Sequence, residues 1–329
     1  MTPRSAKIVG TGMCVPERIM TNEDFTRIVQ TDDEWIVSRT GMKERHIAEP
    51  GQATSDLAVE ASRMALAKAG LEPNDIDLII CATITADNTL PATACWIQDR
   101  LGCKKTGGYD LTAACSGHIY ALTQARANIL SGQARNVLVV SAEILSSITD
   151  YTDRSTCVLF GDGAGAAIVQ ASDEPGTGIL YSKCYCDGSG GELMLLPAGG
   201  SRRPPTHETV DQRLHYMQIR GREVFRFAVE KMQELIDECM KATGLSVEDV
   251  RLVIPHQVNT RIIDAATSRM GFPPDKVFLN IHKYGNTGGA SVAMAHHEAV
   301  AQGLLRAGDV AILVAFGGGL TWAGAAVKH

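Results

Sequence analysis

The chain has 329 residues, of which 45% are hydrophobic and 21% are charged, and its formal net charge is −6. This composition is typical of a globular protein with one large or two medium domains, and the negative charge argues against a general nucleic-acid binder. No stretch approaches the roughly 20 apolar residues of a membrane-spanning helix, and the N-terminus lacks the apolar segment of a signal peptide. The nine cysteines fit reduced thiols in a cytoplasm. We therefore expect a cytoplasmic protein with neither nucleic-acid nor membrane partners.

Short β-branched runs alternate with longer helical patterns, which indicates an α/β fold. In chain order we expect a helix at 54–69, a strand at 77–83, helices at 91–101 and 116–131, a strand at 136–143, a helix at 222–243, a strand at 251–256, helices at 259–270 and 289–305, and a strand at 310–316. Gly70 and Gly244 stand where helix C-caps are expected. Because the central strands are apolar on both faces, helices should cover both sides of each sheet.

Three segments of the first half recur in the same order in the second half. They pair GLEPNDIDLIICA (70–82) with GLSVEDVRLVIPH (244–256), NVLVVSAE (136–143) with DVAILVAF (309–316), and GAGAAIV (163–169) with WAGAAVK (322–328). This order indicates a duplicated α/β unit with a boundary near residues 171–178. We expect halves at 1–173 and 174–329, packed as five α/β/α/β/α layers.

Three residues with catalytic chemistry fall near predicted strand ends, where such folds bind ligands. Cys115, in DLTAACSGH (110–118), stands at an expected helix N-terminus, where free N–H groups and the helix dipole favour a thiolate. His256 ends a strand, and Asn286 lies among glycines in KYGNTGGAS (283–291). Singly, the three fit a packing cysteine, a loop histidine and a turn. Jointly they indicate nucleophilic catalysis, with Cys115 in the first half and His256 and Asn286 in the second.

Metal binding is not expected. Cys184 and Cys186 form a single C-x-C pair that no second pair answers, and the run His296-His297-Glu298 matches no zinc motif. We interpret that run as a solvated helix face.

Motifs along the whole chain together resemble the β-ketoacyl-acyl carrier protein synthase III family, the condensing enzymes that initiate bacterial fatty acid synthesis. The motifs are VGTGMCVPER, TDDEWIVSRTGMKER, AACSG, DRSTCVLFGDGAGAAIV, GREVFRFAV, IPHQVNTRII, YGNTGGAS and FGGGLTW. The resemblance implies the thiolase fold, a homodimer, and a substrate pair of acyl-coenzyme A and malonyl-acyl carrier protein, with no cofactor.

By the same resemblance, Cys115 accepts the acyl group, and His256 and Asn286 stabilise the enolate that forms when the malonyl group loses CO₂. The N–H groups of Cys115 and Gly318 would form an oxyanion hole. A thiolase that abstracts a carbon-bound proton uses a second cysteine near its C-terminus, whereas the last cysteine here is Cys239. This absence favours decarboxylation.

The resemblance also implies the substrate-binding residues. Trp35 would stack on the adenine of coenzyme A with Arg154 on its other face, and Arg39 would meet a phosphate. The remaining contacts to the pantetheine arm and the acyl tunnel would come from Ile219, Gly221, Phe225, Asn259 and Phe316. Leu90 would reach across the dimer to close the acyl pocket, and a leucine there is compatible with a longer or branched acyl group.

An acidic carrier protein would dock on basic residues. The candidates are Arg222, Arg226, Arg261 and Arg269, whose alternative is a solvated helix face that pairs with Glu223 and Glu230.

Three alternatives stay open. His118, directly after the cysteine turn, is either a structural hydrogen-bonding residue or one that tunes Cys115. The enzyme could instead prime a secondary pathway, such as alkylquinolone or polyketide synthesis. The chain could also be a non-catalytic acyl-binding module, although such a module has no need of all three catalytic residues.

Overall fold

The computed structural model describes residues 5–329, so Met1–Arg4 at the N-terminus lie outside it. Its larger sheet has the strand order β1-β7-β6-β4-β5. The strands are β1 (Ser5–Cys14), β4 (Leu78–Ala82), β5 (Gly107–Leu111), β6 (Asn136–Glu143) and β7 (Gly163–Ser172). Strand β4 runs parallel to β5 and β6, whereas β7 runs antiparallel to β6 and β1. All eight residues of β6 are buried, as expected for a strand with helices on both faces.

The second sheet repeats this pattern with the strand order β11-β12-β13-β8. Its strands are β8 (Gly178–Cys186), β11 (Val250–Pro255), β12 (Val310–Gly317) and β13 (Thr321–Lys328). Strand β11 is parallel to β12, and β12, β13 and β8 are successively antiparallel, as β4, β6, β7 and β1 are. The three sequence matches therefore fall on equivalent strand pairs, β4 with β11, β6 with β12 and β7 with β13. The chain passes from one sheet to the other between β7 and β8; a domain division at 173/174 stays a prediction.

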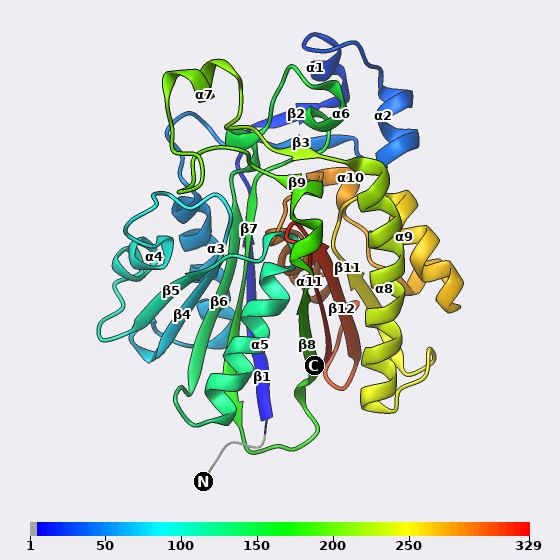
Figure 1. The fold of residues 1–329 in the computed structure, drawn as a ribbon. Coiled ribbons are helices and arrows are strands. Elements are labelled where there is room, and N and C mark those ends of the chain that lie inside the picture. The colour runs from blue at the N-terminus through cyan, green and yellow to red at the C-terminus, as the bar shows by residue number, and fades with distance from the viewer. Residues whose placement is uncertain (1–4) are drawn as a thin grey trace.

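Helices and sheets form five layers, as the sequence predicts (Figure 1). Helices α3 (Thr54–Ala69) and α4 (Thr93–Leu101) cover the outer face of the first sheet, and α8 (Gly221–Thr243) and α9 (Thr260–Thr267) cover the outer face of the second. Helices α5 (Gly117–Leu130) and α11 (Ala290–Ala301) lie between the sheets.

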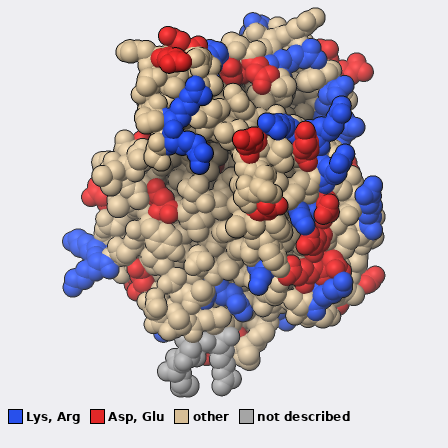
Figure 2. All heavy atoms as spheres, viewed as in Figure 1, with Lys and Arg blue, Asp and Glu red and all other residues tan. Residues whose placement is uncertain are grey.

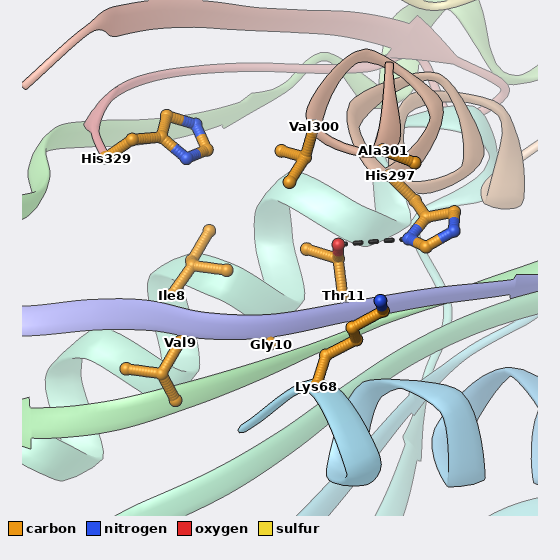
Figure 3. A pocket seen from close by; sticks show the side chains of 9 residues that line it. All are labelled: Ile8, Val9, Gly10, Thr11, Lys68, His297, Val300, Ala301 and His329. Atoms are coloured by element: carbon orange, nitrogen blue, oxygen red, sulfur yellow. Dashed lines mark hydrogen bonds between the residues drawn. The ribbon is translucent and has the colours of Figure 1, made fainter. Parts of the chain in front are cut away.

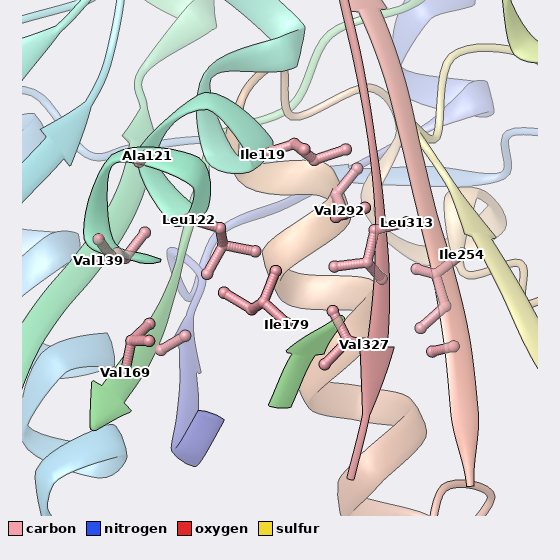
Figure 4. Packing of buried hydrophobic residues seen from close by; sticks show 14 of the residues in the cluster. Ile119, Ala121, Leu122, Val139, Val169, Ile179, Ile254, Val292, Leu313 and Val327 are labelled. Carbon is pink, nitrogen blue, oxygen red and sulfur yellow. The ribbon is translucent and has the colours of Figure 1, made fainter. Parts of the chain in front are cut away.

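The central core lies where these two inner helices meet both sheets (Figure 4). Leu122 of α5 and Val292 of α11 are fully buried there, together with Val139 of the first sheet and Leu313 of the second. Because the two halves share this core, each half shields apolar surface of the other from water.

Short elements gather at one end of the layers (Figure 1). They are β2 (Ile19–Thr21), α1 (Asn22–Thr26), α2 (Asp33–Thr40), β3 (Glu44–His46), α6 (Arg154–Cys157), β9 (Met194–Leu195), α7 (His207–Asp211), β10 (Gln218–Ile219) and α10 (Ile281–Tyr284). No helix of the described residues is long and apolar enough to cross a membrane.

The predicted elements agree with the structure except at some ends. Gly70 and Gly244 cap α3 and α8 with φ angles of 66° and 69°, as predicted. Helix α9 gives way to a 3₁₀ turn over Ser268–Met270, and α11 ends at Ala301 rather than near 305.

The prediction of a solvated face at residues 296–298 is wrong. His296 and His297 are 1% and 8% exposed because α11 is packed between the sheets, and Glu298 is partly buried beside Lys283. His297 Nδ1 lies 3.0 Å from Thr11 Oγ1, at the edge of a cavity of about 400 Å³ between β1, α3 and α11 (Figure 3).

Candidate active site

Cys115 lies at a strained elbow between β5 and α5. It is the central residue of a 3₁₀ turn over Ala114–Ser116, and Ala114 has a φ of 45°, in the left-handed region that alanine rarely adopts. The end of β12 presses on this turn. A Cβ atom at Gly317 would lie 2.6 Å from the Cys115 backbone nitrogen, so only glycine fits there. The tight contact brings the cysteine and the C-terminal glycine motif together.

The three residues predicted to be catalytic line one cavity. Cys115, His256 and Asn286 border a space of about 160 Å³. Its other lining residues are mostly apolar, and they are Ile84, Ala114, Leu145, Leu159, Phe160, Met194, Met217, Ile219, Gly221, Val224, Phe225, Val258, Asn259, Ile262, Gly288 and Phe316. A polar substrate group that enters this cavity leaves water and meets few polar partners besides these three side chains.

His256 follows β11 and is held from several sides. Its backbone N–H donates to the carbonyl of Val314 at 2.8 Å, and its Nδ1 lies 2.6 Å from the hydroxyl oxygen of Ser291. The ring meets Phe316 edge-on, with the ring centres 5.6 Å apart. Burial lowers the pKa of His256 to about 3, so the ring is neutral at pH 7. A neutral imidazole can donate one hydrogen bond without first losing a proton.

Asn286 does not follow a strand, in contrast to the sequence interpretation, but lies in the loop between α10 and α11. Its N–H donates to the Leu159 carbonyl at 2.9 Å, and its own carbonyl accepts from Gly161 N–H at 3.0 Å. Its side-chain Oδ1 accepts from Gly288 N–H at 2.9 Å. Since Oδ1 is engaged, the side chain offers its Nδ2 donor to the cavity.

The structure contradicts the expectation that the position of Cys115 favours a thiolate. Burial raises the pKa of the Cys115 thiol to about 12, and the negative charge of Glu143 adds to the effect. Helix α5 begins only at Gly117, so the thiol lies within the turn before its first residue. The thiol is therefore neutral at pH 7 and must lose its proton as the sulfur attacks.

Glu143 is a buried carboxyl group that the sequence interpretation missed. It ends β6 with no exposed surface and accepts hydrogen bonds from Thr83, Thr85 and the Ile84 backbone. Burial raises its pKa to about 7 against the lowering effect of these bonds. A charged residue at the end of the apolar run NVLVVSAE was the available signal.

His118, in the first turn of α5, is hydrogen-bonded to the first sheet. Its Nδ1 lies 3.0 Å from Ser141 Oγ, and its Nε2 has no partner among the described residues. Burial lowers its pKa to about 3. These contacts fit the structural reading of His118.

Trp35, Arg39 and Arg154 form a cluster at the short-element end, outside the cavity wall. The guanidinium carbons of Arg154 and Arg39 lie 4.4 Å and 5.2 Å from the centre of the Trp35 ring. An adenine between Trp35 and Arg154 needs a separation of roughly 7 Å, twice the contact distance of about 3.5 Å. Arg154 therefore occupies the space that the adenine would take.

Asn259 connects this cluster to the cavity. Its Nδ2 donates to the carbonyl of Arg39 at 2.7 Å, and its Oδ1 caps α9 by accepting from Arg261 N–H at 2.9 Å. Of the other predicted binding residues, Ile219, Gly221, Phe225 and Phe316 line the cavity. Leu90 and Gly318 do not, and Leu90 is 85% exposed.

The predicted docking arginines lie on α8 and near α9. Arg222, Arg226 and Arg269 line a groove between these helices, whereas Arg261 lies in the first turn of α9, outside the groove. Figure 2 shows Lys and Arg along this edge of the molecule. The expected alternative, pairing with Glu223 and Glu230, is not formed, and within residues 5–329 none of the four arginines is in an ion pair.

Comparison with known proteins assigns the family. Residues 109–188 match the family 3-oxoacyl-[acyl-carrier-protein (ACP)] synthase III, and residues 240–329 match its C-terminal domain. A beta-ketoacyl-[acyl-carrier-protein] synthase III of Caldanaerobacter subterraneus is 52% identical over 98% of both chains. One from Solibacter usitatus is 48% identical over 96% of both chains.

Solved structures agree with this assignment. The 3-oxoacyl-[acyl-carrier-protein] synthase III of Aquifex aeolicus has a TM-score of 0.92 and 44% identity, over 98% of this chain and 100% of that one. The priming β-ketosynthase of the R1128 polyketide pathway has a TM-score of 0.91 and 36% identity, over 99% and 96%. The chain therefore belongs to the 3-oxoacyl-[acyl-carrier-protein] synthase III family of condensing acyltransferases and has the thiolase fold.

Proposed function

We propose that this enzyme condenses an acyl-coenzyme A primer with malonyl-acyl carrier protein, through an acyl group on Cys115, and so initiates fatty acid synthesis. One observation carries the proposal. A cysteine thiol, a neutral imidazole and a side-chain amide line the same small, mostly apolar cavity. This set supplies one nucleophile and two donors for a developing oxyanion.

In the first half-reaction, the Cys115 sulfur attacks the thioester carbonyl. The new C–S bond forms as the bond to coenzyme A breaks, and the thiol proton leaves with the coenzyme A sulfur. Although Gly318 is not a lining residue of the cavity, it follows Gly317, which contacts the Cys115 turn, and the N–H groups of Cys115 and Gly318 would stabilise the tetrahedral oxyanion. Because burial raises the pKa of the Cys115 thiol, the sulfur is neutral between turnovers and no charge is buried in the cavity.

In the second half-reaction, the malonyl C–C bond breaks, CO₂ leaves, and the electron pair moves into an enolate. His256 Nε2–H and Asn286 Nδ2–H donate to the enolate oxygen. The carbanion then attacks the acyl-Cys115 carbonyl, and the sulfur leaves as a thiolate and regains a proton. Neither half-reaction requires a cofactor, and we propose that none is used.

Coenzyme A would bind across the Trp35 cluster, with the pantetheine arm passing Asn259 into the cavity. Arg154 would swing from its place on the Trp35 ring to admit the adenine, while Arg39 would meet a phosphate. Ile219, Gly221, Phe225 and Phe316 would line the path of the arm and the acyl chain.

The carrier protein would dock at the groove that Arg222, Arg226 and Arg269 line together with Glu230, and Arg261 would contribute from the first turn of α9. These arginines are free to meet an acidic partner because none is in an ion pair within the described residues. Arg226→Glu should raise KM for malonyl-acyl carrier protein about tenfold and leave KM for malonyl-coenzyme A within about twofold. Equal changes for both substrates would contradict docking at this groove.

The enzyme would act as a homodimer in the cytoplasm. Strand β5 is an unpaired edge of its sheet in this chain. Tyr109 of β5 and Trp96 of the adjoining α4 expose 38% and 36% of their surface, and Leu90, three residues before α4, exposes 85%. A second copy on this edge would cover these residues and bring Leu90 to the partner's acyl pocket. Light scattering that gives the mass of one chain at micromolar concentration would refute this assembly.

Condensation assays test the function directly. The purified protein, malonyl-acyl carrier protein and acyl-coenzyme A primers of increasing length should yield the β-ketoacyl product, and Cys115→Ala should yield none. Inactivity with every primer would refute the condensing function. Because one structural relative primes polyketide synthesis, a marked preference for long or aromatic primers would instead favour a secondary pathway.

A further inference from the structure

Ser291 contacts the functional histidine directly. Its hydroxyl oxygen lies 2.6 Å from His256 Nδ1, and the two residues are 2% and 1% exposed. Ser291 lies in the first turn of α11, the helix that follows the Asn286 loop. The contact therefore joins the middle helical layer to the end of β11.

The surrounding hydrogen bonds fix which atom donates. The Gln257 backbone N–H lies 3.4 Å from Ser291 Oγ, and a backbone N–H can only donate. The Ser291 hydroxyl has no acceptor other than His256 Nδ1 within hydrogen-bonding distance among residues 5–329. The hydroxyl oxygen could also accept a second hydrogen bond, but its own proton would then be buried without an acceptor. The hydroxyl proton is satisfied only if it points at Nδ1, which is then the unprotonated nitrogen of the ring.

The other ring nitrogen then carries the proton. His256 is a lining residue of the cavity, and its Nε2 has no partner within the described part of the chain. Burial lowers the pKa of His256, so the ring is neutral and carries a proton on only one of its two nitrogens. Phe316 holds the ring edge-on and restricts its rotation.

We propose that Ser291 is a positioning residue whose hydroxyl donates to Nδ1 of His256 and thereby places the imidazole proton on Nε2, where it can stabilise an oxyanion. The tautomer assignment stands on the hydrogen bonds alone, whereas its catalytic consequence rests on the proposed function. Without the hydroxyl, the tautomer with the proton on Nδ1 becomes accessible, and that tautomer presents an acceptor to the enolate.

Two variants and a matched control separate positioning from packing. Ser291→Ala removes the donor, and Ser291→Thr keeps it. Ser62→Ala is the control, because Ser62 is also a fully buried helical serine, with its hydroxyl on the Ala58 carbonyl in α3, away from the cavity. Acylation of Cys115 by an acyl-coenzyme A and decarboxylation of malonyl-acyl carrier protein are measured separately for each.

In Ser291→Ala, decarboxylation should fall about 10- to 100-fold at unchanged KM, with acylation within about twofold, and Ser291→Thr should recover most of the rate. Unchanged decarboxylation in Ser291→Ala, or an equal loss in Ser62→Ala, would overturn the proposal.

A spectroscopic measurement decides the tautomer independently of activity. In ¹⁵N-histidine-labelled wild-type enzyme, with His256→Ala for assignment, His256 should show a protonated Nε2 and an unprotonated Nδ1. A proton on Nδ1 would overturn the proposal even if Ser291→Ala failed to fold. If the wild-type enzyme showed the expected tautomer but no condensation, the proposed function would fail while the hydrogen-bond assignment would stand.

Discussion

At the residue scale, His256 and Asn286 are built alike. His256 Nδ1 is hydrogen-bonded to Ser291 Oγ, and Asn286 Oδ1 accepts from Gly288 N–H. Each side chain therefore has one other nitrogen that can face the cavity. Both are fixed before substrate arrives, so little reorganisation is needed when the enolate forms.

His256→Ala and Asn286→Ala should therefore retain acylation of Cys115 and lose malonyl decarboxylation about 100- to 1000-fold, the cost of removing one oxyanion donor. Release of CO₂ from malonyl-acyl carrier protein, measured beside the mass of the acylated enzyme, gives both rates. If either variant decarboxylated at the wild-type rate, that residue would not stabilise the enolate.

Sequence patterns predicted the residues of the site better than their electrostatics. Cys115, His256 and Asn286 stood out because turn residues surround them, and the structure brings them together. The pKa of Cys115 was predicted in the wrong direction, because the thiol is buried at a turn that contacts β12 and feels the charge of Glu143, and both are distant in sequence. Glu143 was missed because its hydrogen-bond partners, too, come from a segment that is distant in the sequence.

At the element scale, the elbow between β5 and α5 depends on the end of β12. Gly317→Ala would place a Cβ atom 2.6 Å from the Cys115 backbone nitrogen and push the turn away. We expect acylation to fall at least about tenfold and the free energy of unfolding to fall by about 1–3 kcal/mol, the usual cost of overpacking.

Gly188→Ala is the matched control, since a Cβ atom there would meet no atom within 4 Å. Acylation rates and urea unfolding of the two variants make the comparison. A Gly317→Ala enzyme that acylates as fast as Gly188→Ala would show that the contact does not hold the elbow.

Hydrophobic periodicity predicted the order and type of the main elements, because each strand and helix carries its own pattern. It could not predict that α11 is buried from Ala290 to His297. His296 and His297 look solvated in the sequence, but their neighbours come from β1, α5 and the C-terminal residue His329, which only the folded chain brings together.

At the scale of the whole molecule, the duplicated halves share one core and enclose neutral histidines. Burial lowers the pKa of His118 and of His256 to about 3, and that of His296 well below its usual value. In the unfolded chain these histidines become protonated below about pH 6.5. The contribution of these buried histidines to the free energy of unfolding is therefore complete above pH 6.5 and is lost as the pH falls towards 3.

We expect the free energy of unfolding to fall between pH 6.5 and 5, by up to about 1.4 kcal/mol per pH unit for each buried histidine. Glu143 opposes one of them, because its raised pKa of about 7 lets the folded state hold a proton in this range. Urea unfolding at several pH values gives the slope of the free energy of unfolding against pH. This slope should be smaller in His118→Gln by about the contribution of one buried histidine. Equal slopes in the variant and the wild type would contradict the burial of a neutral His118.

The central claim is that Cys115 carries the acyl group, and the intact mass of the protein tests it most directly. After incubation with an acyl-coenzyme A, the wild-type mass should rise by one acyl group, and the mass of Cys115→Ala should stay unchanged. An unmodified wild type, or an equal adduct on Cys115→Ala, would contradict the account.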